Sequence, residues 1–192
     1  MATTILLHGG RLRLVDKRND SYFQRLTRDL NDGDIVLQVG FACRDAVKRQ
    51  IVFDREREFI LNQTNKKLNV VEADYDNFES QLELAKSIHI TGGESPYLIE
   101  DIKKYPNFIK IIQDKVVGGS SAGACIFSAL YWYGEEDRMC NGLGTLPIAL
   151  FVHKGSEEFN ATEEKMINFK KHIGNFELVA LEECEWIEKT ID

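Results

Sequence analysis

One short stretch, an apolar run that ends in paired glycines and serines, decides how this chain folds. It reads Val116-Val117-Gly118-Gly119-Ser120-Ser121-Ala122-Gly123-Ala124. From Gly119 onward it fits the pattern G-x-S-x-G, a sharp strand–turn–helix junction that lifts a serine side chain clear of the sheet edge. The positions around such a turn must be small, as Gly119, Ala122 and Gly123 are. We therefore predict a strand over 116–118, a tight turn at Ser121 and a helix from Ala122 to about Tyr133.

Apolar runs alternate with amphipathic stretches on the N-terminal side of this turn. The expected strands are 3–7, 35–39, 68–71 and 87–90, and the expected helices are about 20–31, 44–61, 77–86, 95–104 and 107–113. This alternation is typical of a three-layer α/β fold, a mostly parallel sheet with helices on both faces. In the helix over 44–61 we expect the apolar residues to face inward, namely Val47, Ile51, Phe53 and Phe59.

The pattern is less regular after Gly134. We expect a short strand pair or bent loop over 142–152, a helix over 161–173 with Met166, Ile167 and Phe169 inward, and a strand over 176–181. A hairpin is expected to begin at 184–187. No linker, internal repeat or low-complexity tract interrupts the chain, so residues 1–192 are expected to form one domain.

Composition limits the classes of partner. The chain carries 24 Lys and Arg against 31 Asp and Glu, a net charge of −7, which argues against a nucleic-acid partner. No apolar run is long enough to span a membrane, so no membrane partner is expected. The cysteines are Cys43, Cys125, Cys140 and Cys184, and none forms a C-x-x-C pair. Free thiols in a reducing cytosol are the simplest interpretation, with Cys125 packing as a small hydrophobic residue.

A serine hydroxyl needs a base to become a nucleophile, and the chain offers four histidines as candidates for Ser121. His89 lies inside an apolar strand and is expected in the core, whereas His172 is expected to be exposed. His8 ends the first strand and is a weak reserve candidate. His153 follows an apolar run at a strand end, from which its ring can reach the edge that carries Ser121.

The imidazole needs an acid to orient it. Glu182 and Glu183 both follow the strand over 176–181, and the residues alone do not decide between them. Asp137 and Glu135 are further candidates in a looser, charged loop.

Backbone N–H groups would have to stabilise an oxyanion at this turn. The amide of Ala122, at the start of the helix, is one candidate donor, and the amide of Gly93 in the Gly92-Gly93 turn is the other. Two other interpretations of the Ser121 stretch are a Gly/Ser-rich loop without catalytic function and a phosphate-binding loop. The absence of a G-K-[ST] ending disfavours the phosphate loop.

Three motifs and a histidine occur together in the order typical of one family. They are Ile90-Thr91-Gly92-Gly93, Gly119-Ser120-Ser121-Ala122-Gly123-Ala124, Gly142-Leu143-Gly144-Thr145-Leu146-Pro147 and, after these, His153. Over nearly the whole chain this order resembles the peptidase E family, the S51 serine peptidases that include dipeptidase E and the relatives of cyanophycinase. The resemblance implies a class I glutamine-amidotransferase-like, flavodoxin-like fold with serine where amidotransferases carry cysteine.

The resemblance also implies roles for individual residues. Ser121 would be the nucleophile, His153 the base and Glu183 the acid, with Gly93 and Ala122 as oxyanion donors. The implied activity is hydrolysis of short peptides at an N-terminal residue, with an acidic residue as one candidate, through an acyl-enzyme and without metal or cofactor. An amidase or esterase on the same fold and a catalytically silent ligand-binding relative remain alternatives. The oligomeric state is left open between monomer and homodimer.

The sequence departs from the family at two positions near the expected site. Glu94 stands where the family often has asparagine, and an acid there would repel an acidic substrate side chain. Lys154 follows His153 where an aromatic residue is common, and a lysine could attract a carboxylate. Both are therefore candidate substrate-binding residues. The chain stops at Asp192, where relatives usually continue with a final hairpin, so we expect it either to be truncated before that hairpin or to be a short member.

Overall fold

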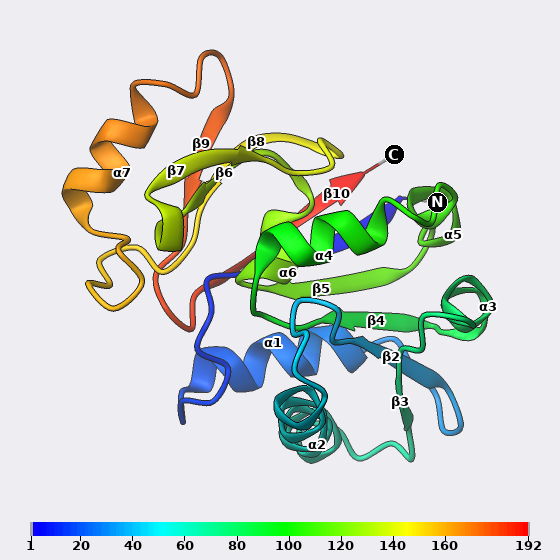
Figure 1. Ribbon diagram of the computed structural model, residues 1–192. Coiled ribbons are helices and arrows are strands. Elements are labelled where there is room, and N and C mark those ends of the chain that lie inside the picture. The colour runs from blue at the N-terminus through cyan, green and yellow to red at the C-terminus, as the bar shows by residue number, and fades with distance from the viewer. Residues whose placement is uncertain (1, 192) are drawn as a thin grey trace.

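The computed structural model describes residues 2–191 and contains two β-sheets, seen in Figure 1. The main sheet has the order β10-β1-β5-β4-β2-β3. Its strands are β1 (Thr3–His8), β2 (Ile35–Val39), β3 (Asn69–Glu72), β4 (Ser87–Ile90), β5 (Val116–Ser120) and β10 (Trp186–Ile191). All neighbouring strands in it are parallel except β10, which pairs antiparallel with β1. The predicted α/β class is confirmed.

Helices cover both faces of the main sheet. One face packs against α1 (Lys17–Thr27) and α2 (Ala46–Asn62), and the other packs against α3 (Phe78–Leu84), α4 (Ser95–Ile102), α5 (Phe108–Ile111) and α6 (Ala122–Cys125). The first two helices begin at side-chain caps, because Asp16 accepts from the N–H of Arg18 and Asp45 accepts from the N–H of Val47. This arrangement brings the carboxyl ends of β1, β4 and β5 to one edge.

A second sheet, which sequence analysis did not foresee, follows α6. It has the order β7-β6-β8-β9, formed by β6 (Ser128–Tyr133), β7 (Arg138–Asn141), β8 (Leu146–Phe151) and β9 (Glu177–Ala180). A short 3-10 helix η1 (Gly134–Glu136) joins β6 to β7, and α7 (Glu163–Lys170) lies between β8 and β9. The helix expected from Ala122 to about Tyr133 is therefore wrong beyond Cys125. The aromatic residues near Tyr133 favour a strand, and β6 is hydrogen-bonded on both sides.

The inward face predicted for α2 is also wrong in part. Val47 and Ile51 are 71% and 59% exposed, whereas Glu56 and Ile60 are buried. The physical reason is a buried hydrogen bond, since the Glu56 carboxylate lies 2.9 Å from Nε2 of His89 on β4. A prediction from hydrophobic periodicity alone misses a helix face that is buried around a charged residue such as Glu56. In α7, likewise, Phe169 is buried but Ile167 is exposed.

The two sheets share one hydrophobic core. Ile5 and Leu7 of β1 belong to the same buried cluster as Tyr131 of β6 and Leu150 of β8. β10 does not form the expected hairpin after residue 184. It returns to the main sheet and pairs with the whole of β1, as Figure 1 shows. Within residues 2–191, helices with the length and apolar character needed to cross a bilayer are absent.

Candidate active site

Ser121 occupies a strained turn between β5 and α6. Its φ is 51° and its ψ is −110°, a combination that few residues with a side chain adopt. The turn also demands glycine on either side. A Cβ added to Gly119 would overlap the carbonyl oxygen of Gly123, and a Cβ added to Gly123 would overlap the carbonyl oxygen of Ile90. The Ser121 side chain is thereby held at the carboxyl edge of the main sheet.

His153 places its ring against this serine. Its Nε2 lies 2.9 Å from the Oγ of Ser121, within hydrogen-bonding distance. The residue lies two positions after the end of β8, is 6% exposed and has a φ of 57°. The ring of Phe159 stacks on the imidazole with centroids 3.8 Å apart and an interplanar angle of 20°. Gly10 packs against the Cε1 side of the ring, where a Cβ would overlap it. The imidazole is therefore fixed in place.

Of the two candidate acids, Glu183 lies beside the histidine. Its Oε1 is 3.5 Å from the Nδ1 of His153, a contact too long to count as a hydrogen bond. Nδ1 is buried and has no hydrogen-bond partner within residues 2–191. The same carboxylate oxygen accepts from the Nε of Arg11 at 3.2 Å. The neighbouring Glu182 is exposed and reaches Glu185 through its backbone N–H.

The two candidate oxyanion donors lie next to Ser121. Ala122 is the first residue of α6. Gly92 packs against the serine, since a Cβ there would lie 3.4 Å from the Ser121 Cβ, and this brings the following Gly93 to the same place. Gly93 has a φ of 140°, and a Cβ there would be 2.6 Å from the carbonyl oxygen of Ala42, so only glycine fits.

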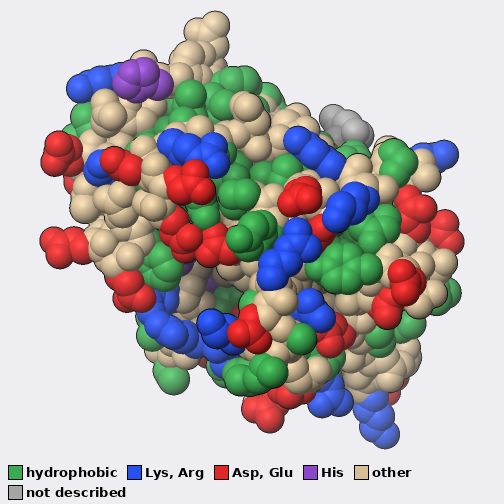
Figure 2. All heavy atoms as spheres, viewed as in Figure 1, with side chains coloured by type: hydrophobic (Ala, Val, Ile, Leu, Met, Phe, Trp, Pro, Cys, Tyr) green, Lys and Arg blue, Asp and Glu red, His purple; other side chains and the backbone are tan. Residues whose placement is uncertain are grey.

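A cleft of about 380 Å³ opens over Ser121 and His153. Figure 2 shows a hollow with a histidine at its base, Asp and Glu side chains on one side and Lys and Arg side chains on the other. The lining residues on the side of the second sheet include Glu94, Tyr133 and Glu135, and those on the side of α1 and α2 include Arg13 and Arg55. The cleft is therefore bipolar, and two more carboxylates of its lining, Glu56 and Glu158, pair with Arg55 and Arg11.

Glu94 points into this cleft, whereas Lys154 does not contribute to it. The Tyr133 hydroxyl hydrogen-bonds to a carboxylate oxygen of Glu94 and lies 3.1 Å from Glu135. Burial, together with the neighbouring Glu94, raises the pKa of Glu135. Lys154 is not among the described residues that line the cleft. Its backbone N–H donates to the carbonyl of Leu181.

The environment of His153 favours a neutral imidazole. Burial lowers its pKa to about 4, although the Glu183 carboxylate acts in the opposite direction. An imidazole that is uncharged near neutral pH can accept a proton from the Ser121 hydroxyl.

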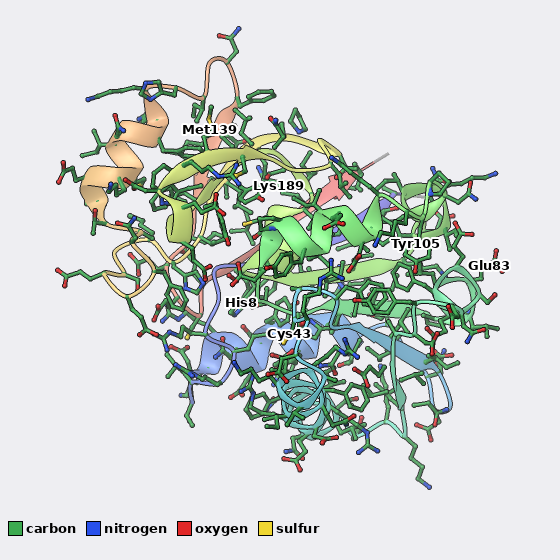
Figure 3. All side chains as sticks on the ribbon, in the orientation of Figure 1. His8, Cys43, Glu83, Tyr105, Met139 and Lys189 are labelled. Carbon is green, nitrogen blue, oxygen red and sulfur yellow. The ribbon has the colours of Figure 1, made fainter. Side chains whose placement is uncertain are left out.

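The rings of the other three histidines hydrogen-bond to residues other than Ser121. His8, labelled in Figure 3, contacts Asn19 through Nε2 at 2.8 Å and accepts from the N–H of Gly10 through Nδ1. Both of its ring nitrogens are therefore occupied, and burial lowers its pKa to about 3. His89 is fully buried in the core, as expected, and His172 is exposed.

Cys125 behaves as a core residue. It is buried in α6, and burial raises the pKa of its thiol to about 12. The thiol therefore stays protonated and is a poor nucleophile. All four cysteines are free.

Arg11, Phe159 and Tyr133 are parts of the site that sequence reasoning missed. Arg11 carried a signal, because it follows Gly9-Gly10 at the carboxyl end of the first strand, where sites of such sheets form. Phe159 and Tyr133 had none, because their positions depend on the second sheet.

Comparison with solved structures identifies the fold. The chain superposes on a peptidase from an acI-B1 Actinobacterium with a TM-score of 0.70 and 17% identity, covering 98% of this chain and 84% of that one. It also superposes on a proposed peptidase E protein from Listeria monocytogenes EGD-e with a TM-score of 0.66 and 16% identity, covering 100% of both chains. The fold is that of these two peptidases. No protein-family model matches the chain, and no curated protein shows significant sequence similarity to it.

Proposed function

We propose that this chain is a serine peptidase that hydrolyses short peptides. The observation that carries the proposal is the 2.9 Å contact between Ser121 Oγ and His153 Nε2 at a strained strand–turn–helix junction. A serine is activated when a base lies within hydrogen-bonding reach and is itself oriented by a third group, and Glu183 is the group next to the imidazole. The two peptidases that share the fold support this assignment.

The proposed reaction proceeds through an acyl-enzyme. Ser121 Oγ attacks the peptide carbonyl while His153 Nε2 accepts its proton, and Glu183 stabilises the imidazolium that forms. The N–H groups of Gly93 and Ala122 bind the developing oxyanion, and each such donor is typically worth about 3–4 kcal/mol in the transition state. His153 then gives the proton to the leaving amine. A water molecule then attacks the ester carbonyl while His153 takes its proton, and His153 gives that proton to Ser121 Oγ as the ester bond breaks and the acid product leaves.

The bipolar cleft supports an exopeptidase or dipeptidase. The carboxylates of Glu94 and Glu135 can bind the ammonium group of an N-terminal residue, and Arg13 and Arg55 can bind substrate carboxylates. A preference for an acidic N-terminal residue, which the family resemblance implies, would depend on these arginines because Glu94 opposes it. We place the enzyme in the reducing cytosol, where its four free thiols would persist.

The deciding experiment compares the wild type with Ser121→Ala on N-terminal aminoacyl chromogenic substrates, aspartyl included. We expect turnover by the wild type and none by Ser121→Ala. Ser80→Ala, an exposed position in α3, is the matched control. A serine-directed phosphonate should label Ser121, as peptide mass spectrometry would show. Full activity in Ser121→Ala would contradict the proposal. No turnover by folded wild type would shift the assignment to an amidase, an esterase or a silent ligand-binding protein.

A further inference from the structure

Arg11 contacts three residues of the site, Glu158, Phe159 and Glu183, all of which lie far from it in the sequence. It follows β1, and its side chain is 13% exposed. Its Nε donates to Oε1 of Glu183 at 3.2 Å, and its Nη2 contacts the carboxylate of Glu158. Its guanidinium carbon lies 4.9 Å from the centre of the Phe159 ring, which itself stacks on His153. Arg11 thus reaches the imidazole by two routes, one through a carboxylate and one through an aromatic ring.

The Glu183 route is the more informative of the two. The oxygen that accepts from Arg11 is the same one that lies 3.5 Å from Nδ1 of His153. No other charged side chain is paired with Glu183 among residues 2–191. A carboxylate on a surface loop has several rotamers, and a charge-assisted hydrogen bond from a largely buried guanidinium selects one of them. In this site that partner is Arg11.

Resting on the proposed function, we infer that Arg11 is the positioning residue of the catalytic site. It holds the Glu183 carboxylate beside His153 and, through Phe159, holds the plane of the imidazole. It does not touch the reacting atoms. The requirement is for arginine, because the flat guanidinium can donate to two carboxylates and stack on an aromatic ring at the same time. A lysine would supply the positive charge but not the planar group with several N–H donors.

The charge of Arg11 also bears on the protonation of His153. The charged or titratable groups that act on this ring are Glu183, Glu158, Arg11 and His8. The two carboxylates favour the imidazolium, and Arg11 opposes them. Removing the guanidinium takes away the cation that competes with the imidazolium for Glu183, so the carboxylate, although less ordered, is free to pair with the charged ring. The pKa of His153 should then rise, and the acid limb of kcat/KM should move to higher pH.

The test compares Arg11→Gln and Arg11→Lys with the wild type in steady-state hydrolysis across pH. For Arg11→Gln we expect kcat to fall by about 10- to 100-fold, the usual effect of losing a partner that orients a functional histidine, with little change in KM. The acid limb should shift upward. Arg11→Lys should restore the acid limb but only part of kcat. Arg28→Gln, which removes an exposed arginine on the far end of α1, is the charge-matched control and should match the wild type.

A readout independent of hydrolysis separates this inference from the proposed function. In the Ser121→Ala background, ¹⁵N NMR of the imidazole follows the protonation of His153, assigned with His153→Gln. Arg11→Gln should begin to charge this ring at a higher pH than its parent. If hydrolysis is absent altogether but this shift occurs, the proposed function fails, and what stands is only that Arg11 sets the environment of His153.

Two results would overturn the inference. One is Ser121-dependent hydrolysis whose kcat and acid limb are unchanged in Arg11→Gln. The other is an unshifted His153 titration in the NMR experiment. If Arg11→Gln does not fold, as judged by circular dichroism, Arg11→Lys decides: wild-type kcat overturns the inference, and a reduced kcat with an unshifted acid limb supports it.

Discussion

Ser121 and His153 each have a positive φ, and the same short segment holds both. The N–H of Ser121 donates to the carbonyl of His8 at 2.9 Å, and the N–H of His153 donates to the carbonyl of Gly9 at 3.1 Å. Backbone conformations of this kind typically cost about 1–3 kcal/mol each. The carboxyl end of β1 thus holds the proposed nucleophile and base side by side. The two strained backbone conformations are those of the residues to which the chemistry is assigned.

At the same scale, Glu94 should control which N-terminal residue is accepted. We expect Glu94→Gln to raise kcat/KM for an aspartyl substrate by roughly fivefold relative to an alanyl substrate, because a like-charge repulsion worth about 1 kcal/mol in water at ~4 Å is removed. Glu136→Gln is a suitable control, since this exposed glutamate pairs with Arg138 outside the cleft. An unchanged ratio of the two kcat/KM values would mean that Glu94 does not face the substrate side chain.

The candidate residues were predictable from sequence to different degrees. The predicted Ser121, His153 and Glu183 lie together in the structure. Each follows the carboxyl end of a strand, and these ends converge, although β5 belongs to the main sheet and β8 and β9 belong to the second sheet. The choice of Glu183 over Glu182 depends on which way a turn rotates two adjacent side chains. Arg11 contacts Glu183 across 172 residues of sequence, and no local pattern reports such a contact.

At the scale of elements, the junction between β5 and α6 depends on the absence of a side chain. Gly123→Ala should lower the free energy of unfolding by about 3 kcal/mol or more, because a Cβ there would overlap the backbone of Ile90 and push α6 off β4. Urea denaturation followed by circular dichroism measures this change. Gly33→Ala is the control. It has a φ of 87° and open space around it, so it should cost only about 1–2 kcal/mol. Equal losses would contradict this explanation.

The strands of the main sheet were predictable, because apolar runs between turn residues are typical of strands buried on both faces. The second sheet was not. β6 follows α6 after two residues, and the apolar run from Ala122 to Tyr133 satisfies a helical pattern as well as an extended one. Long-range pairing with β7 and β8 decided the outcome, as tertiary contacts often do when local preference is ambiguous.

At the scale of the whole molecule, two buried histidines should make the protein sensitive to acid. The pKa of His153 is lowered to about 4 and that of His8 to about 3, mainly by burial. Below pH 6.5 the unfolded chain takes up protons at both rings while the folded chain does not. Stability is therefore complete above pH 6.5 and is lost as pH falls toward about 4. The maximal slope is roughly 2.7 kcal/mol per pH unit for two groups.

Urea denaturation at pH 7, 6 and 5 measures this dependence. His8→Gln should flatten it by about half, since one of the two groups is removed. His172→Gln, at an exposed position, should leave the slope unchanged. A free energy of unfolding that is constant between pH 7 and pH 5 would show that neither ring is kept neutral by the fold.

The proposed nucleophile and its base stand on different sheets. Ser121 ends a strand of the main sheet, whereas His153 and Glu183 follow strands of the second. The distance between the Ser121 and His153 side chains therefore depends on how the two sheets pack together. A displacement of one sheet by about 1 Å can reduce the rate of the catalysed reaction about a hundredfold. Substitutions in the shared core, far from the cleft, must therefore meet two requirements. They must preserve the stability of the fold, and they must preserve the position of Ser121 relative to His153 and Glu183.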